Sequence, residues 1–280
     1  MAPTAGRSRG GISYRRLGRG VPILLLHGLP GSAASWSGVA ERLSDRHEVI
    51  LPDLLGFGAS VKPTSLASLH AAGQAEALAQ LLDELALERI AVVGHDFGGP
   101  VGVHLAGRYP ECVTHLGLFA TNLFPDTPIP FPLSLVNAPI VARAAQRLVF
   151  SRASLRMMLR TGTGRPRIRL DPTTYLGDAD QVRAIQTIFA GSLSSLVELY
   201  EPVARYAGTI EVPTLVGWGT RDPFFPVAEG ERAAAALSTP LRLYADAGHF
   251  LPEERVTEVA DDIALLLGSP DQGESSTSDG

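Results

Sequence analysis

The stretch Val92–Gly99, "VVGHDFGG", places an acidic residue where chemistry could be done. It reads as the end of a buried strand, a tight turn between glycines and the start of a helix. A serine nucleophile often occupies the centre of such a G-x-S-x-G turn, but here the centre is Asp96. A carboxylate is already ionised at neutral pH and can attack an sp³ carbon directly. The pattern therefore predicts a covalent alkyl ester of Asp96.

Two further residues could complete the reaction of such an ester. Asp222 lies in "LVGWGTRDPFFP" and His249 lies in "YADAGHFLPEE", each after an apolar run. His249 could activate a water that attacks the ester carbonyl, while Asp222 holds the imidazole in orientation. We therefore expect Asp96, Asp222 and His249 to form a catalytic set, in the chain order nucleophile, acid, histidine.

The elements that must position these residues alternate between strands and helices. Short apolar runs, rich in valine, isoleucine and leucine, are typical of strands that are covered on both faces. Helix-length segments separate them, so the sequence predicts an α/β fold with a mostly parallel sheet flanked by helices. The expected strands are 22–26, 48–51, 90–93, 115–120, 213–217 and 241–245, and the expected helices of this part are 33–43, 66–87, 97–109 and about 253–267.

Residues 125–206 interrupt this alternation. The stretch "FPDTPIPFP" opens the segment, and helical patterns follow at 133–148, 153–160, 178–190 and 193–206 without a strand. We interpret it as a helical cap over the carboxyl ends of the strands, where ligands bind in open α/β sheets. The loop 161–171 between two of these helices is interpreted as an ordinary surface loop rather than a gate. The predicted division is core 1–124, cap 125–206, core 207–268 and a disordered tail, 269–280.

Composition excludes several classes of function. The 280 residues carry a formal charge of −5, whereas nucleic-acid binders usually show a basic field. Cys112 is the single cysteine, so no intrachain disulfide is expected. Neither a signal peptide nor a membrane span is recognisable, and we expect a cytoplasmic protein. The histidines lack metal-ligand spacing and no G-x-G-x-x-G follows the first strand, so neither a metal nor a cofactor is predicted.

Five strand-end motifs together carry a family resemblance. They are "HGLPGS" from His27, "PDLLGFGAS" from Pro52, "GHDFGG", "GTRDP" and "DAGHF". In this order they resemble the α/β-hydrolase fold family over about residues 11–268, and most of all its branch with an aspartate nucleophile. That branch includes epoxide hydrolases and haloalkane dehalogenases. The resemblance implies an oxyanion hole formed by the backbone N–H groups of Leu29 and Phe97.

The resemblance also bears on the substrate. Epoxide hydrolases place tyrosines in the cap to protonate the alkoxide, and Tyr200 is the first candidate here, with Tyr175 second. Haloalkane dehalogenases use tryptophan N–H groups to hold the halide, but Trp36 and Trp218 lie outside the cap and Phe97 follows Asp96. We therefore favour an apolar epoxide that is hydrolysed to a vicinal diol. A cleft lined by Phe97, Leu133, Val136, Phe150 and Phe189 would suit such a compound.

Three alternatives stay open. One is a haloalkane dehalogenase-like hydrolase. Another is a hydrolase-fold protein that binds a small molecule without converting it. A serine-type esterase is the least favoured, because Asp96 occupies the central position of the G-x-S-x-G pattern, where such an enzyme needs a serine. The sequence gives no indication of the oligomeric state.

Overall fold

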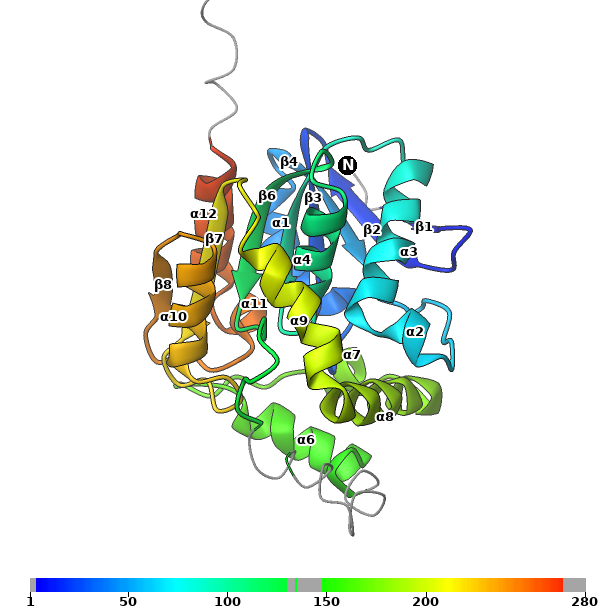
Figure 1. Cartoon of the computed structure of the whole chain (residues 1–280), viewed down its shortest axis with the longest axis vertical. Coiled ribbons are helices and arrows are strands. Elements are labelled where there is room, and N and C mark those ends of the chain that lie inside the picture. The colour runs from blue at the N-terminus through cyan, green and yellow to red at the C-terminus, as the bar shows by residue number, and fades with distance from the viewer. Residues whose placement is uncertain (1–3, 130–133, 135–147, 269–280) are drawn as a thin grey trace, which may run out of the picture.

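The computed structural model describes residues 4–129, 134 and 148–268, and these residues form an eight-stranded sheet covered by helices (Figure 1). The strand order is β1-β2-β4-β3-β5-β6-β7-β8. From β3 to β8 all neighbouring strands are parallel, whereas β1 and β2 join the edge in antiparallel register. The strands are β1 (Thr4–Arg7), β2 (Ser13–Gly18), β3 (Val21–Leu26), β4 (His47–Pro52), β5 (Ile90–His95), β6 (Val113–Phe119), β7 (Thr214–Gly219) and β8 (Leu241–Tyr244).

The predicted fold class is confirmed. Each of the six predicted strands is present, with its ends shifted by at most two residues. The antiparallel strands β1 and β2 were not predicted, because they are half-exposed or exposed and lack a continuous apolar run. The helices of the described residues are η1 (Ala33–Trp36), α1 (Ser37–Leu43), α2 (Leu66–Leu69), α3 (Ala71–Glu84), α4 (Gly98–Arg108), α6 (Arg152–Thr161), α7 (Pro172–Leu176), α8 (Ala179–Ser194), α9 (Leu196–Ala207), α10 (Val227–Ala236), α11 (Leu251–Glu254) and α12 (Val256–Leu267).

Two apolar clusters lie on the two faces of the sheet. Successive side chains of a strand point to opposite faces, and β3 divides accordingly between the clusters. Leu24 and Leu26 belong to the cluster that includes α3 and α4, whereas Ile23 and Leu25 belong to the cluster with α1 and α12. Burial on both faces explains why the central strands are apolar without alternation.

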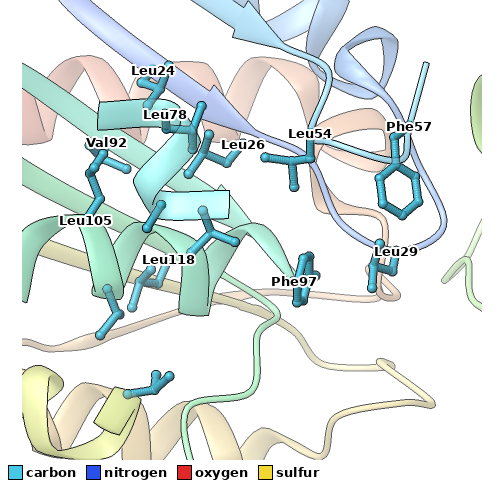
Figure 2. Close-up of a cluster of buried hydrophobic side chains, with 14 of the residues drawn as sticks. Leu24, Leu26, Leu29, Leu54, Phe57, Leu78, Val92, Phe97, Leu105 and Leu118 are labelled. Carbon is cyan, nitrogen blue, oxygen red and sulfur yellow. The ribbon is translucent and has the colours of Figure 1, made fainter. Parts of the chain in front are cut away.

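The first of these clusters leads from the sheet to the strand ends. Figure 2 shows Leu24, Val92 and Leu105 at one end of it, and Leu29 and Phe97 at the other. Leu29 follows β3 and Phe97 follows β5, so both apolar side chains stand where the two loops leave neighbouring strands. Packing in this cluster therefore fixes the backbone of both loops.

The inserted helices α6, α7, α8 and α9 lie in the chain between β6 and β7, and α6 and α8 appear below the sheet in Figure 1. Among the described residues of this segment there is no strand, as predicted. The expected helix 133–148 falls almost wholly outside the described residues, as does the tail 269–280. The boundaries of core and cap therefore remain our proposal. No helix in the described parts of the chain is long and apolar enough to cross a bilayer.

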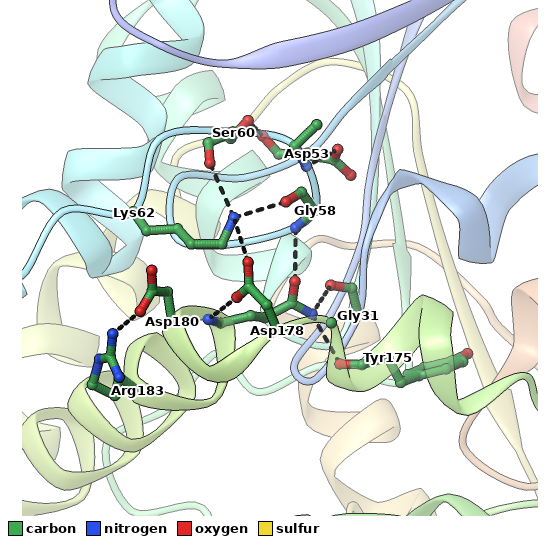
Figure 3. Close-up of polar contacts among 12 residues, drawn as sticks. Gly31, Asp53, Gly58, Ser60, Lys62, Tyr175, Asp178, Asp180 and Arg183 are labelled. Carbon is green, nitrogen blue, oxygen red and sulfur yellow. Dashed lines mark hydrogen bonds and ion pairs between the residues drawn. The ribbon is translucent and has the colours of Figure 1, made fainter.

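Helix α8 is tied to the core at its first turns (Figure 3). The side chain of Gln181 is buried; it accepts from the N–H of Gly58 at 2.8 Å and donates to the carbonyl oxygen of Gly31 at 3.4 Å. Lys62 donates to the carbonyl oxygen of Gly58 at 2.8 Å and lies 3.9 Å from the carboxylate of Asp178, just before α8. The loops after β3 and β4 therefore hold the inserted helices over the strand ends.

Candidate active site

Asp96 occupies a strained turn between β5 and α4. Its φ of 50° lies in the left-handed region, which residues other than glycine rarely adopt. Neighbouring Gly98 is required by close packing, because a Cβ there would lie 2.4 Å from the carbonyl oxygen of Leu26. The Asp96 carbonyl oxygen accepts a hydrogen bond of 2.6 Å from the Thr121 hydroxyl. Strain of this kind persists only where the surroundings enforce it, and here the carboxylate that it presents reaches the Leu29 N–H and lines a cavity.

The structure brings the three predicted catalytic residues together. His249 Nδ1 lies 2.9 Å from Asp222 Oδ2, and His249 Nε2 lies 3.5 Å from Asp96 Oδ2. The other oxygen of Asp222 accepts from the N–H groups of Phe224 and Phe225 at 2.8 and 3.0 Å. Because both oxygens of Asp222 are engaged, the carboxylate is fixed and can orient the imidazole between the two acids.

The charges of the set are interdependent. Burial disfavours the His249 imidazolium, but the charge and hydrogen bond of Asp222, followed by those of Asp96, outweigh burial and raise its pKa to about 10. Burial likewise opposes ionisation of Asp96, yet the hydrogen bond and charge of His249 lower its pKa below the usual range. The resting site therefore holds the Asp96 carboxylate beside an imidazolium.

The predicted oxyanion hole is represented by one hydrogen bond. The N–H of Leu29 donates to Asp96 Oδ1 at 2.6 Å. Phe97 is the N-cap residue of α4, but none of the hydrogen bonds among the described residues joins its N–H to the Asp96 carboxylate. The role of the Phe97 N–H therefore stays a prediction. The Leu29 N–H therefore contacts the carboxylate directly and is placed to stabilise negative charge on that oxygen.

A cavity of about 110 Å³ adjoins Asp96. Asp96 and His249 line it together with side chains from the inserted helices α6, α8 and α9. Of the apolar residues expected from the sequence, Phe97 and Phe189 line it, while Phe150 is buried behind Phe189. Leu133 and Val136 fall outside the described residues. The lining residues are Leu29, Pro30, Asp96, Phe97, Pro100, Asn122, Thr127, Pro128, Ile129, Met158, Ile188, Phe189, Leu196, Tyr200, Phe224, Phe225, His249 and Phe250.

Tyr200 of α9 shares this cavity with Asp96. Burial, together with the nearby charge of Asp96, raises the pKa of its phenol, and a hydrogen bond from Asn122 opposes the shift only in part. The Asn122 oxygen is committed to the Phe124 N–H at 2.9 Å and the Thr127 hydroxyl at 2.6 Å, so its amide N–H₂ is left to face the phenol. Tyr200 is therefore protonated at neutral pH and held in place by a donor.

Tyr175 does not share that position. Its side chain is buried against Phe250, its hydroxyl donates to Glu253, and it does not line the cavity. The prediction that Tyr175 could be a second proton donor is therefore not supported by its position. The difference arises because α7 places the Tyr175 hydroxyl beside Glu253 of the short helix α11 and not in the cavity with Asp96.

Two other histidines shape the loops around Asp96, as their motifs suggested. His27 donates from Nδ1 to the Gly28 carbonyl oxygen at 2.9 Å and accepts from the Leu54 N–H at 3.0 Å. His95 donates from Nε2 to the His249 carbonyl oxygen at 2.8 Å. Burial, followed by the charge of His249, lowers the pKa of His95 to about 4, so it remains the neutral donor that this bond needs.

Sequence reasoning missed several residues of the site. The interpretation of 161–171 as an ordinary surface loop is wrong at its start, because the Gly162 carbonyl oxygen accepts from the His249 N–H and the Gly164 N–H donates to Glu254 of α11. Asn122 and Thr127 were also missed. The two closely spaced glycines were the available signal for the loop, whereas nothing in the sequence marks the asparagine. No three or more His, Cys, Asp or Glu side chains in the described part of the chain are arranged so that they could hold a metal ion.

Comparison with known proteins gives relatives that span most of the chain. Residues 21–256 match the family model described as alpha/beta hydrolase fold. An uncharacterized protein of Mycobacterium tuberculosis is 32% identical over 254 residues, which are 85% of this chain and 72% of the relative. A cis-3-alkyl-4-alkyloxetan-2-one decarboxylase of Shewanella oneidensis is 28% identical, covering 91% and 85% of the two chains. A soluble epoxide hydrolase of a Corynebacterium species is 26% identical, covering 92% and 94%.

Solved structures agree on the fold. The epoxide hydrolase CorEH superimposes with a TM-score of 0.77 at 22% identity, covering 95% of this chain and 98% of its own. The haloalkane dehalogenase DbeA from Bradyrhizobium elkani gives 0.78 at 20% identity, with the same coverage. Together with the family match and the strand order, these similarities show that the chain belongs to the α/β-hydrolase fold family.

Proposed function

We propose that the chain is a hydrolase that works through an alkyl ester of Asp96 and that its substrate is an apolar epoxide. The observation that carries the proposal is the pairing of an ionised Asp96 with the protonated Tyr200 in one cavity. Asp96 would attack a ring carbon from one side, while Tyr200 would protonate the oxygen that leaves from the other. The epoxide hydrolase among the relatives supports the same substrate class.

The second half of the cycle follows from the charge on Asp96. Once alkylated, Asp96 is a neutral ester, so one of the two carboxylates that raise the pKa of His249 is gone. The imidazole can then lose its proton and take one from a water. That water attacks the ester carbonyl, the diol leaves, and the Leu29 N–H stabilises the oxyanion.

A haloalkane is less well supported as substrate. Both tryptophan N–H groups are already used inside the core, where Trp36 donates to the Leu26 carbonyl oxygen at 3.0 Å and Trp218 to the Phe225 carbonyl oxygen at 2.9 Å. Neither indole lines the cavity. A departing halide would therefore lack the indole N–H donors that are expected for a dehalogenase-like reaction.

A strained cyclic ester is a second candidate. Tyr200 is the one tyrosine among the described residues that line the cavity, and an oxetan-2-one needs no proton donor, because ring opening at the alkyl carbon releases a carboxylate. The ester would then collapse: the C–C bond to the carboxylate breaks to release CO₂, an alkene forms, and the carbon–oxygen bond to Asp96 is cleaved. The decarboxylase of Shewanella oneidensis among the relatives supports this class.

Labelled water separates the two candidates and tests the covalent ester. With enzyme in excess and an apolar epoxide in oxygen-18 water, the first turnover is expected to give unlabelled diol, since the new oxygen comes from Asp96. The label should then be found in the Asp96 peptide. A diol labelled in the first turnover would contradict the ester. With an oxetan-2-one, decarboxylation is expected to give alkene and CO₂ and to leave Asp96 without label, whereas hydrolysis would give a hydroxy acid.

Replacing Tyr200 with phenylalanine is expected to slow epoxide opening by roughly 10²–10⁴-fold, the usual contribution of a general acid. Tyr206→Phe is the matched control, because Tyr206 lies on the same helix but packs against His104 outside the cavity. The rate of ester formation is the quantity to measure, by rapid quench. A Tyr200 variant that opens epoxides within a few-fold of the parent rate would remove this residue from the mechanism.

A further inference from the structure

Glu254 makes a set of contacts that the reaction outlined above does not use. It ends α11, the short helix that begins two residues after His249, and it is not among the residues that line the cavity. Its Oε2 accepts from the Gly248 N–H at 3.0 Å, and its Oε1 accepts from the Phe250 N–H at 3.1 Å. One carboxylate therefore binds the backbone on both sides of the histidine.

The same carboxylate also reaches the inserted segment. Glu254 Oε2 accepts from the Gly164 N–H at 2.6 Å. Gly164 lies directly against the loop 245–250 between β8 and α11, which carries His249 and is called the histidine loop below. A Cβ on Gly164 would be 1.9 Å from the carbonyl oxygen of Asp246 in this loop. Next to this contact, the Arg165 N–H donates to the same Asp246 oxygen at 2.7 Å. The segment 162–165 is thus fastened to the histidine loop at several points.

The backbone of His249 itself is held between two other parts of the chain. Its N–H donates to the Gly162 carbonyl oxygen at 2.8 Å, and its carbonyl oxygen accepts from His95 Nε2 at 2.8 Å. His95 directly precedes Asp96 in the chain. The His249 backbone is therefore bonded to the turn around Asp96 on one side and to the segment 162–165 on the other. The Glu254 carboxylate stabilises this arrangement, because it accepts from the N–H groups of both chain neighbours of His249.

The neighbouring Glu253 differs in its environment. Burial, followed by the charges of Glu254 and Asp171, raises the pKa of Glu253 to about 8, so this carboxyl is protonated at neutral pH. It contacts the Tyr175 hydroxyl and none of the backbone groups around His249. Hydrogen bonds from N–H groups to an ionised carboxylate are stronger than bonds to a neutral acceptor. Of the two adjacent glutamates, Glu254 binds the loop around His249, and the neutral Glu253 does not. Glu253 is therefore the matched position for a control variant.

We propose that Glu254 is a positioning residue for His249, and that it does so by joining the histidine loop to the segment 162–165; this inference rests on the proposed function. His249 must reach Asp222 and, through a water, the carbonyl carbon of the Asp96 ester. A displacement of about 1 Å at such a site can cost on the order of 10²-fold in rate. Formation of the ester needs Asp96 and Tyr200, whereas its hydrolysis needs His249. Loss of Glu254 should therefore slow the second step selectively.

The test compares Glu254→Gln with Glu253→Gln. In Glu254→Gln the amide N–H₂ replaces an oxygen that accepts from a backbone N–H, so two donors must face each other. Glu253→Gln keeps a neutral acceptor for the Tyr175 hydroxyl. Rapid quench followed by intact-mass spectrometry gives the two rates. For Glu254→Gln we expect ester formation within a few-fold of the parent and ester hydrolysis slower by about 10²-fold. Glu253→Gln should match the parent in both steps.

A second measurement needs no substrate. The proton on His249 Nδ1, which faces Asp222 at 2.9 Å, should give a resonance far downfield in a proton NMR spectrum of the full chain. We expect Glu254→Gln to broaden or remove this signal through faster exchange, and Glu253→Gln to keep it. If Glu254→Gln does not fold, Glu254→Asp retains the charge with a shorter reach and is measured in the same two ways.

Several outcomes would overturn the proposal. Equal slowing of both steps in Glu254→Gln would indicate a general loss of structure, and unchanged hydrolysis with an unchanged downfield resonance would leave no positioning effect. Failure of the proposed function looks different, because the parent protein itself would then form no ester on Asp96. In that case the NMR comparison still decides whether Glu254 positions His249.

Discussion

Replacing Asp96 with asparagine is expected to lower turnover by on the order of 10⁶-fold, the loss typical of removing a covalent nucleophile. The amide has nearly the shape of the carboxylate and tolerates the left-handed conformation at φ 50° better than most side chains. It can still accept the hydrogen bond from the Leu29 N–H at 2.6 Å. What it lacks is the negative charge that attacks carbon.

The control for this prediction is stability. A strained turn that presents a buried charge to a cavity is a feature that proteins retain for function at the expense of stability. The melting temperature of Asp96→Asn should therefore equal or exceed that of the parent. Asp96→Ala guards against slow deamidation back to aspartate and should be equally inactive. Residual turnover above about a hundredth of the parent rate, in a variant free of deamidation, would place the nucleophile elsewhere.

The central sheet and the grouping of Asp96, Asp222 and His249 could be predicted because both leave local signals. Strands buried on two faces must be apolar throughout, and residues such as Ile23 and Val92 make that visible. Catalytic groups lie at strand ends, and a turn between glycines is needed to present Asp96. These requirements act within a few residues of sequence, so a single chain is sufficient to recognise them.

The remaining parts depend on contacts between segments that are distant in sequence. Strand β2 was missed because its hydrogen bonds to β4 stabilise an edge whose side chains, such as Arg15 and Arg16, are polar. Helix α7 places Tyr175 beside Glu253, and only the packed structure shows which way that ring faces. Glu254 binds backbone N–H groups, which every residue type offers, so its partners leave no pattern to read.

Replacing His249 with glutamine is expected to stop the reaction after its first step. Glutamine cannot take a proton from water, so hydrolysis of the ester should slow by at least roughly 10²–10⁴-fold. The ester of Asp96 would then accumulate, and intact-mass spectrometry should show one substrate-sized adduct on each chain. Absence of any adduct with every accepted substrate would contradict the covalent mechanism.

The same variant should change the pH dependence in a defined direction. In the parent, His249 lowers the pKa of Asp96, so ester formation should be flat through the neutral range. Without His249 the pKa of Asp96 rises, and ester formation should slow as the pH falls through that value, because protonated Asp96 cannot attack.

In the parent, the rate of ester hydrolysis should depend on pH at the high end of the scale, not the low end. It needs the neutral imidazole, so its rate should rise with pH until His249 is deprotonated. In the resting site the pKa of His249 is about 10. In the ester it must be lower, because the Asp96 charge has been lost. A hydrolysis rate that rises and levels off below pH 10 in the parent, but is independent of pH in His249→Gln, would therefore identify the imidazole as the base.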